Sequence, residues 1–537
     1  MNKIRGQMRP LVPVISVFLA VIAAGCGDDT KKTSTGGSTS TPRLSGQLHY
    51  ESVPYDVANE GLDYSKLEKR PIRGARVLLL DVANDNILEE TTSTNEGTYS
   101  FDWSGVPNVK LWVYAETTTP SIMVVDNTAV NARYVMESAE IVVDRPKTLD
   151  LLAGSGWTGA SYGKPRQAAP FSILDAAYTA AKRFLDEGKP APTFPKLEIN
   201  WSVDNRPEDG NVNIGQIGTS YWDGAEIFIL GKEDVDTDEF DTHVIVHEWG
   251  HSFEDLISRS DSPGGSHGFG DVLDPRIAFS EGFCNALSGI ILEPNTVYSD
   301  SSGMGQKDGF WDDVDENDKS ASVKAGWFSE STVQHIVFDV YDGDGNGVEA
   351  FDQVALGIPG IYGLMTGYMK STPAQTTLFP FVAGLKADHP DSAGAIDTLV
   401  GYHQSSGAFG VDTITDDWGT NETHNGDDPY SIPVYTSLKI GDTKTIMLIG
   451  GIESSMLGQN RFLRFTGNGS PVKVSTSSAE DVDLYVYQKH DEVGSSVTTT
   501  GNESTQFATK SGEEYVIAVQ GYGEISGAYP VTVKVTP

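Results

Sequence analysis

Short runs of alternating apolar and polar residues occupy two parts of the chain, residues 43–153 and residues 431–537. Examples are GARVLLLDV and VKLWVYAET in the first part, and DVDLYVYQK and YPVTVKVTP in the second. Glycine, serine and asparagine separate these runs, as is usual for turns between strands. The alternation predicts a β-sandwich in each part.

Between these two parts, residues 165–425 have a mixed pattern. Residues 168–187 have the spacing of an amphipathic helix, whereas LEINWS and GAEIFILG have the pattern of strands. We therefore expect a multidomain protein in which a central α+β domain lies between two β-sandwiches.

The first residues have the pattern of an export signal. Basic residues precede an apolar run over residues 11–24, which is short for a membrane span and is soon followed by Cys26. We expect residues 1–25 to be a signal peptide and residues 26–42 to be a flexible tether of small polar residues. An ordinary signal peptide or a single uncleaved anchor is the alternative.

The small residues AAG before Cys26 resemble a bacterial lipobox, in which the cysteine thiol receives lipid. This resemblance implies a lipid anchor in the cell envelope of a bacterium. By resemblance to lipoprotein sorting in enterobacteria, Gly27 in place of an aspartate after the cysteine implies the outer membrane or the cell surface. Of the two cysteines, a lipidated Cys26 would leave only Cys284, so no intramolecular disulfide could form.

Composition and charge narrow the range of partners. The hydrophobic content of 38% is ordinary for a globular protein. The formal net charge of -37 repels phosphate backbones and anionic headgroups. We therefore expect neither nucleic acid nor electrostatic docking on a membrane, whereas bound cations are compatible with such a chain.

The stretch THVIVHEWGHSF, residues 242–253, contains three of the ten histidines. His247, Glu248 and His251 form the motif HExxH, which on a helix places both imidazoles on one face, one turn apart. In such a motif the imidazoles bind one zinc ion, and the glutamate is the general base that activates water. A pair of hydrogen-bonded core histidines is the alternative.

We expect the helix that carries this motif to begin near residue 238, with Asp236 or Thr237 as its cap. His243 is on the same helix but is excluded as a third ligand. Eight residues of helix rise about 12 Å, whereas Zn–N bonds are about 2 Å long.

A zinc hydrolase needs three protein ligands and one open position. Glu281 is the preferred third ligand, because it is the one carboxylate in PRIAFSEGFCNALSGIIL, a predicted helix that begins after Asp274. Asn285, four residues later, could hydrogen-bond a ligating histidine. His267 and Asp271, in the glycine-rich insertion between the two helices, are the rival ligands.

HExxH on one helix and a glutamate on the next resemble the gluzincins, the thermolysin-like clan of zinc metallopeptidases. The longer interval between His251 and Glu281 departs from thermolysin, and so does asparagine at position 285 in place of aspartate. The resemblance implies a zincin-like fold and a protein or peptide substrate, with Glu248 passing the proton of water to the leaving amine. It also implies a tyrosine or histidine that stabilises the oxyanion, for which the candidates are His335, Tyr341 and His403.

The flanking regions have resemblances of their own. GARVLLLDVANDNILEETTSTNEGTYSFDW, with Thr94, Gly97 and Tyr99 at a turn, resembles the carboxypeptidase regulatory-like domain. DVDLYVY, TKSGEEYVIAVQGYG and SGAYPVTVKV resemble, in that order, the bacterial pre-peptidase C-terminal domain, which accompanies secreted peptidases.

DGDGNGVEAFDQ, residues 342–353, places Asp342, Asp344 and Asn346 at the first, third and fifth positions of a calcium loop. Gln353 stands where such a loop has its bidentate glutamate. A nonstandard Ca²⁺ site and a simple turn both remain open.

These features together predict a surface-anchored zinc endopeptidase. The alternative is a noncatalytic adhesin or polymer-binding lipoprotein with a vestigial zinc domain. Glu248 favours the enzyme, since a decayed site has no need of a general base beside two metal ligands.

The lipobox resemblance predicts that Cys26→Ser abolishes labelling with a fatty-acid probe and releases or mislocalises the protein, because the substitution removes the acceptor thiol. Labelling followed by cell fractionation measures both effects. Unchanged acyl labelling of the Cys26→Ser protein would contradict lipidation at this residue.

Overall fold

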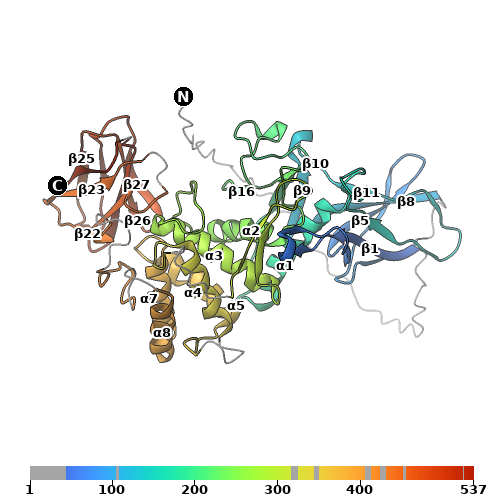
Figure 1. Ribbon diagram of the computed structural model, residues 1–537, viewed down its shortest axis with the longest axis horizontal. Helices are drawn as coiled ribbons and strands as arrows, with labels where there is room; N and C mark the ends of the chain where they lie inside the picture. Colours follow the sequence, from blue (N-terminus) through green and yellow to red (C-terminus); the bar gives the residue numbers. More distant parts are fainter. Residues whose placement is uncertain are drawn as a thin grey trace, which may run out of the picture. The chain divides into compact units, whose positions relative to one another are not determined.

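The computed structural model describes residues 44–103, 108–315, 324–343, 350–404, 413–423, 431–451, 455–523 and 525–537 (Figure 1). The expected signal peptide, the tether and Cys26 lie outside the described residues, and so do Asp344 and Asn346 of the calcium-loop pattern. No helix among the described residues is both long enough and apolar enough to cross a membrane.

Strand β1 (Leu44–Ser52) organises the first sheet. Leu44, Leu48 and Tyr50 are buried while the polar residues between them are more exposed, as the alternating sequence predicts. In the described part of the chain β1 pairs with four short strands: β4 (Glu68–Pro71), β7 (Thr98–Phe101), β13 (Lys147–Thr148) and β14 (Leu151–Ala153).

A second, larger sheet crosses the boundary that we expected between residues 153 and 165. Its strands lie in the order β16-β17-β15-β9-β8-β5-β6, and three more short strands pair with β8 or β9. β9 (Ser121–Asp126) pairs antiparallel with β8 (Asn108–Thr118) and parallel with β15 (Leu197–Trp201). The N-terminal strands and the central region therefore share one sheet, so residues 43–153 are not the separate sandwich that we expected.

The burial of β9 explains this continuity. Its four consecutive residues 122–125 are all buried, which is typical of a strand covered on both faces and not of a half-exposed sandwich strand. The remaining strands of this sheet are β5 (Ala75–Asp81), β6 (Ile87–Thr92), β10 (Ala132–Arg133), β11 (Val135–Glu137), β12 (Ile141–Val142), β16 (Tyr221–Trp222) and β17 (Ile227–Ile229).

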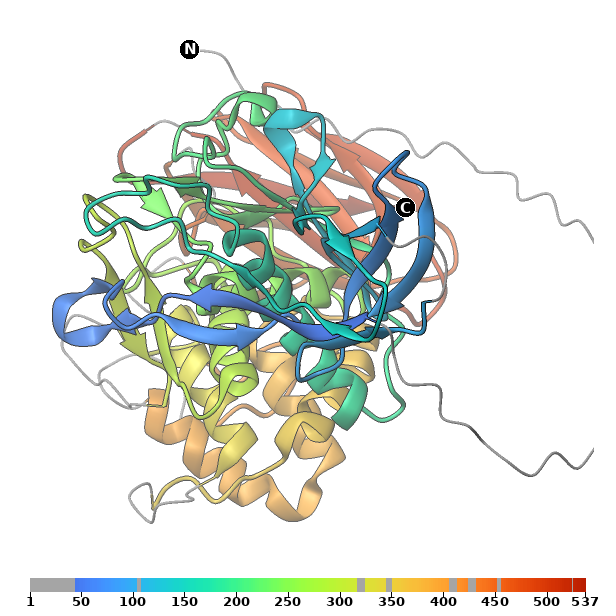
Figure 2. The same ribbon diagram turned by 90° about the vertical axis from the view of Figure 1, so that its right-hand side faces the viewer.

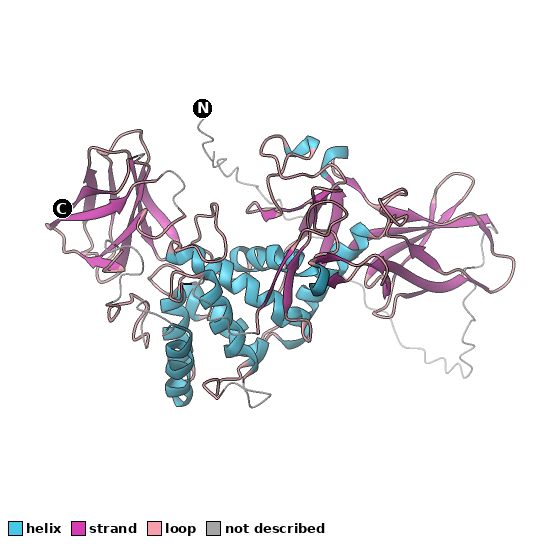
Figure 3. Ribbon diagram, viewed as in Figure 1, coloured by secondary structure: helices cyan, strands magenta, loops and turns pink. Residues whose placement is uncertain are grey.

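Helix α3 (Pro275–Leu292) is the centre of the helical region. Its residues from Pro275 to Ile291 are all buried, because it packs between α2 (Thr242–Leu256) and α4 (Glu330–Asp342). Figure 3 shows the helices in cyan, and Figure 2 shows the later ones, in yellow and orange, packed as a group. The other helices are α1 (Ala169–Glu187), α5 (Gly357–Thr366), α6 (Tyr368–Ser371), α7 (Leu378–Asp388) and α8 (Ala393–Gln404).

The two helices that carry the motif residues differ in how well their starts were predicted. Asp274 caps α3 as expected, since its carboxylate accepts a hydrogen bond from the backbone N–H of Arg276 at 3.0 Å. Helix α2 begins at Thr242 and not near residue 238. Asp236 and Thr237 form strand β19, which pairs with β18 (Gly231–Lys232), so the predicted cap was wrong.

Residues from 435 onward form two sheets that pack face to face. Their strand orders are β22-β24-β29-β26-β27 and β23-β30-β25-β28. Leu463, Leu484 and Ile517 of the first sheet share a core with Val474 and Val533 of the second, which makes this region a β-sandwich, as the alternation predicts.

The strands of this sandwich are β22 (Tyr435–Ser437), β23 (Thr443–Ile449), β24 (Asn460–Thr466), β25 (Pro471–Ser477), β26 (Val482–Gln488), β27 (Asp491–Ser496), β28 (Ser504–Ala508), β29 (Glu514–Gly521) and β30 (Ala528–Thr536). Four short strands form two further hairpins, β2 (Tyr55–Asp56) with β3 (Gly61–Leu62) and β20 (Val297–Asp300) with β21 (Phe310–Asp313).

The C-terminal sandwich contacts the start of α3. Oδ2 of Asp274 accepts a hydrogen bond from Nδ2 of Asn460 at 2.8 Å. The same carboxylate accepts hydrogen bonds from the buried guanidinium of Arg276, which lies 4.8 Å from the ring centre of Phe462. The first turn of α3 is therefore held partly by the sandwich.

Asp274→Ala should destabilise the protein by about 3–5 kcal/mol, because it removes a helix cap and leaves the charge of Arg276 buried without its partner. Urea unfolding followed by circular dichroism measures the change. Asp274→Asn should cost less, since the amide oxygen can still cap the helix. The exposed Asp391 provides a control, whose replacement by alanine should change stability by less than about 0.5 kcal/mol. Wild-type stability of Asp274→Ala would contradict this role.

Candidate metal centre

Helices α2 and α3 bring two histidines to face one glutamate. The Nε2 atoms of His247 and His251 are 3.0 Å apart. Oε2 of Glu281 is 3.2 Å from Nε2 of His247 and 3.3 Å from Nε2 of His251. We call these three residues the His-Glu group. Three donor atoms from two helices thus converge on one point.

Neighbouring residues hold the other ring nitrogen of each histidine. Nδ1 of His247 lies 2.7 Å from Oδ1 of Asn285, which is the contact expected of that asparagine. Nδ1 of His251 lies 3.2 Å from Oγ of Ser280, whose hydroxyl donates to the carboxylate of Glu254. Because Nδ1 of each ring is held in this way, Nε2 is the nitrogen that each ring presents to the group. No sequence pattern had indicated Ser280 or Glu254.

Glu281 is 6% exposed, and its ion-pair partners among the described residues are histidines, with no lysine or arginine. Burial alone would raise the pKa of its carboxyl, but the imidazoles of His251 and His247 hold that pKa well below its ordinary value. The ionised carboxylate, which is the form that binds a cation, is therefore favoured.

The donor chemistry of the His-Glu group fits Zn²⁺. Imidazole nitrogen and carboxylate oxygen are both zinc ligands, and three protein ligands leave one coordination position open. The ligand atoms of His247, His251 and Glu281 all lie within 4.8 Å of one another. A group that includes two nitrogens suits zinc better than calcium or magnesium, which prefer oxygen alone.

Glu248 follows the first histidine on α2 and is 8% exposed. Burial raises the pKa of its carboxyl, although His247 and His251 oppose the shift. A hydrogen bond with the backbone of Trp222, in strand β16, also reaches this carboxyl. Glu248 is thus next to His247 in a helix that contacts the edge strand of the sheet.

His267, a rival ligand in the sequence, lies beside the group. Its Nε2 is 3.4 Å from Oε1 of Glu281, and its Nδ1 is 3.1 Å from Oε2 of Glu330. Burial would lower the pKa of His267, but the two carboxylates raise it to about 9, so the ring is positively charged at neutral pH. Asp271, the other rival, is not among the described residues whose ligand atoms meet in the group.

Two further aromatic residues line α2 near the group. His243 is buried, its Nδ1 is 2.9 Å from Oγ of Ser288, and burial lowers its pKa to about 3, so it is a neutral core histidine. The ring of Tyr298, in β20, lies 6.0 Å from that of His247. No spacing in the sequence had indicated Tyr298, because it comes from a separate hairpin.

The three candidates for an oxyanion-stabilising residue have other described partners. His403 pairs with Asp339 at 2.6 Å, His335 stacks on His403 at 5.8 Å, and Tyr341 donates to Glu293 at 2.6 Å. None of these contacts involves the His-Glu group. His267 and Tyr298 are the histidine and the tyrosine that lie beside it.

The calcium-loop pattern is only partly described. Asp342 is the last residue of α4, and burial, together with Asp315, raises its pKa to about 7. Because Asp344 and Asn346 lie outside the described residues, calcium binding by this loop stays a prediction.

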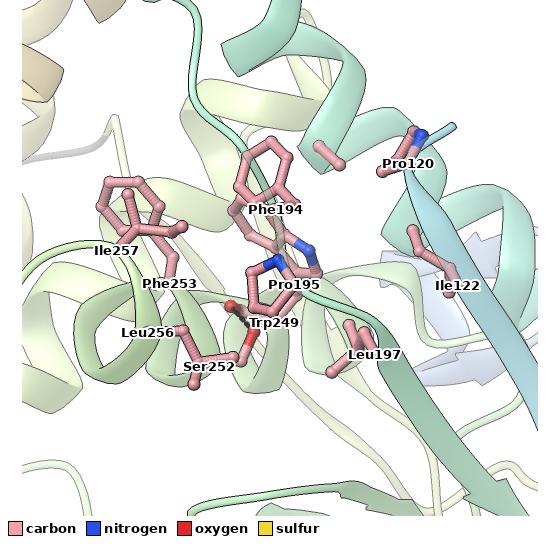
Figure 4. A pocket seen from close by; sticks show the side chains of 11 residues that line it. Pro120, Ile122, Phe194, Pro195, Leu197, Trp249, Ser252, Phe253, Leu256 and Ile257 are labelled. Carbon is pink, nitrogen blue, oxygen red and sulfur yellow. Dashed lines mark hydrogen bonds between the residues drawn. The ribbon is translucent and has the colours of Figure 1, made fainter. Parts of the chain in front are cut away.

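A pocket lies on another face of α2 (Figure 4). Trp249, Phe253 and Leu256 line it from α2, where they leave the helix away from His247 and His251. Its remaining lining comes from Pro120, Ile122, Ala181, Phe194, Pro195, Leu197, Ser252 and Ile257. This pocket is mainly apolar, and no residue of the His-Glu group lines it.

Comparison with solved structures found partial similarities. One is to the pre-peptidase C-terminal domain of a collagenase from Bacillus anthracis, with 15% identity and a TM-score of 0.16, over 19% of this chain and 93% of that chain. Another is to PirA, with 8% identity and a TM-score of 0.12, over 17% of this chain and 92% of that chain. No protein-family model matches the sequence, and no curated protein matches it significantly.

The positions of Glu281 and His267 predict that their replacement has different effects on zinc binding. Glu281→Ala should weaken zinc binding by roughly tenfold or more, because it removes a donor atom of the group. His267→Ala should leave the zinc content near that of the wild type, since its ring contacts the outer oxygen of Glu281.

Zinc content after dialysis, measured by plasma mass spectrometry, tests this pair of variants. His247→Ala is the positive control for loss of a ligand. If His267→Ala emptied the site while Glu281→Ala retained zinc, the assignment of Glu281 would be overturned.

Proposed function

We propose that this protein is a zinc-dependent peptidase whose centre is the His-Glu group, with Glu248 as the general base. The observation that carries the proposal is the convergence of the ligand atoms of His247, His251 and Glu281 beside the buried Glu248. The HExxH motif and its resemblance to gluzincins support the same assignment.

Zn²⁺, held by His247, His251 and Glu281, would supply Lewis acidity to a peptide carbonyl and lower the pKa of a water molecule. In this proposal Glu248 accepts the proton of that water and donates it to the leaving amine. Its raised pKa suits this exchange, because a carboxyl that is too acidic would not return the proton. His267, beside Glu281 and positively charged, is a donor for the negative charge that develops on the carbonyl oxygen.

The edge of the large sheet supports a peptide as the substrate. β16 is the last strand in the described order of this sheet and pairs with β17 on one side only. An extended peptide can add to such an edge through main-chain hydrogen bonds. Helix α2, which carries the proposed base Glu248, packs beside β16. A peptide bound along β16 would therefore pass close to the His-Glu group.

The proposed location of the enzyme is the bacterial cell surface, with the chain anchored by lipid at Cys26. In this proposal the zinc-binding centre belongs to an endopeptidase, because a sheet edge accepts a chain that continues in both directions.

The variant Glu248→Gln distinguishes a role in catalysis from a role in metal binding. The amide cannot accept a proton, so peptidase activity should fall by at least about a hundredfold, whereas zinc content should stay at the wild-type level. A quenched-peptide library measures the first effect, and metal analysis measures the second.

The matched control is Glu96→Gln, at an exposed turn residue, which should keep both activity and zinc. Wild-type peptidase activity in Glu248→Gln would exclude Glu248 as the base. Stoichiometric zinc without peptidase activity in the wild-type protein would instead favour a noncatalytic binding function.

A further inference from the structure

A second group of acidic residues lies just ahead of helix α2 in the fold. Asp236 is in β19, Asp238 follows it, and Asp300 ends β20. One ligand oxygen from each of these three aspartates lies within 4.8 Å of the others. An isolated bridge between Asp236 and Ser302 joins the two segments. We call these three residues the aspartate group.

Few hydrogen-bond donors and no described positive side chains compensate the charge of these carboxylates. Asp238 is 2% exposed, and Ser220 donates a hydrogen bond to its Oδ2. Its buried Oδ1 accepts no hydrogen bond in the described part of the chain, and neither does Oδ1 of Asp236. The described ion pairs contain no lysine, arginine or histidine partner for Asp236, Asp238 or Asp300.

Asp241 adds a fourth carboxylate at the edge of this group. It is 1% exposed, and its Oδ1 also lacks a hydrogen-bond partner among the described residues. Its Oδ2 accepts hydrogen bonds from the side chain and the backbone N–H of Ser301, at 2.5 and 3.2 Å. Because Ser301 follows Asp300 directly, Asp241 is tied to the same corner of the fold.

Burial and mutual repulsion act together on these side chains. Burial raises the pKa of Asp236 to about 7, with a further contribution from Asp300. Burial and the neighbouring aspartates also raise the pKa values of Asp238 and Asp241 well above their ordinary range. Without a counter-charge, these buried carboxylates are therefore costly to ionise.

We propose that Asp236, Asp238 and Asp300 bind one Ca²⁺ ion, with Asp241 close enough to support it. All side-chain donors in the group are carboxylate oxygens, which suit a hard cation and not zinc. Ca–O distances of about 2.3–2.6 Å place ligands on opposite sides of the ion roughly 4.6–5.2 Å apart. The three oxygens lie within 4.8 Å of one another, which is close enough for them to share one such ion.

The ion would connect β19 and β20 at the point where the chain enters α2. Asp241 is the N-cap residue of α2, although its side chain does not cap the helix itself. Tyr298, on the other connected strand, packs against His247. The aspartate group thus has a structural role that is separate from the His-Glu group, and its occupancy does not depend on the proposed peptidase activity.

Calorimetric titration of the zinc-loaded full chain with CaCl₂ tests the proposal. The double variant Asp238→Asn/Asp300→Asn should bind one Ca²⁺ ion fewer than the wild type. Saturating calcium should raise the Tm of the wild type by about 3 °C or more, and this rise should be largely lost in the double variant.

Without calcium, the double variant should no longer be the less stable of the two proteins. In a calcium-free buffer the double variant should melt at or above the Tm of the wild type, because the amides relieve the repulsion between buried carboxylates. This result would also show that the variant folds. Asp391→Asn, at an exposed site, is the matched control and should bind calcium as the wild type does. Absence of calcium binding by the wild type, or equal binding by the double variant, would overturn the proposal.

Discussion

The candidate site depends on one buried carboxylate that faces two imidazoles across a helix pair. Glu281 belongs to α3, which is buried along almost its whole length, and its described ionic partners are histidines. A buried carboxylate is stable only when it is paired, hydrogen-bonded or bound to a metal. Asn285 and Ser280 bind the far nitrogens of His247 and His251, so the polar groups of the two helices form one connected network. This network requires α2 and α3 to keep their relative position.

The large sheet supplies part of that constraint. Helix α2 packs beside β16 and β17, while Phe184 of α1 stacks on Phe253 of α2 with ring centres 4.6 Å apart. Because β9 joins the N-terminal strands to β15, those strands belong to the platform of the site and are not an independent module. The C-terminal sandwich contributes as well, since Asn460 binds the carboxylate that caps α3. Three regions of the chain therefore position a site built from two helices.

Two candidate metal-binding groups of different chemistry lie close together in the chain. The His-Glu group offers two nitrogens and one oxygen, whereas the aspartate group offers side-chain oxygens only. Ligand preference would direct zinc to the first group and calcium to the second. In the two proposals, one ion takes part in the reaction and the other stabilises the entry to the helix that carries Glu248. In these proposals, cations bind some of the interior carboxylates of a chain whose formal net charge is -37.

The sequence by itself determined the features that depend on short-range spacing. These are the shared face of His247 and His251, the helix around Glu281 with Asn285 one turn on, and the alternating strands of the C-terminal sandwich. The tertiary structure alone decided that β9 pairs with β15, that residues 236–237 form a strand and not a cap, and that His267 lies beside Glu281. It alone brought Asp300 to Asp236 and Asp238. The physical reason is that strand pairing and contacts between buried side chains join segments that are far apart in the sequence. These contacts do not change the local periodicity of either segment, so the periodicity does not predict them.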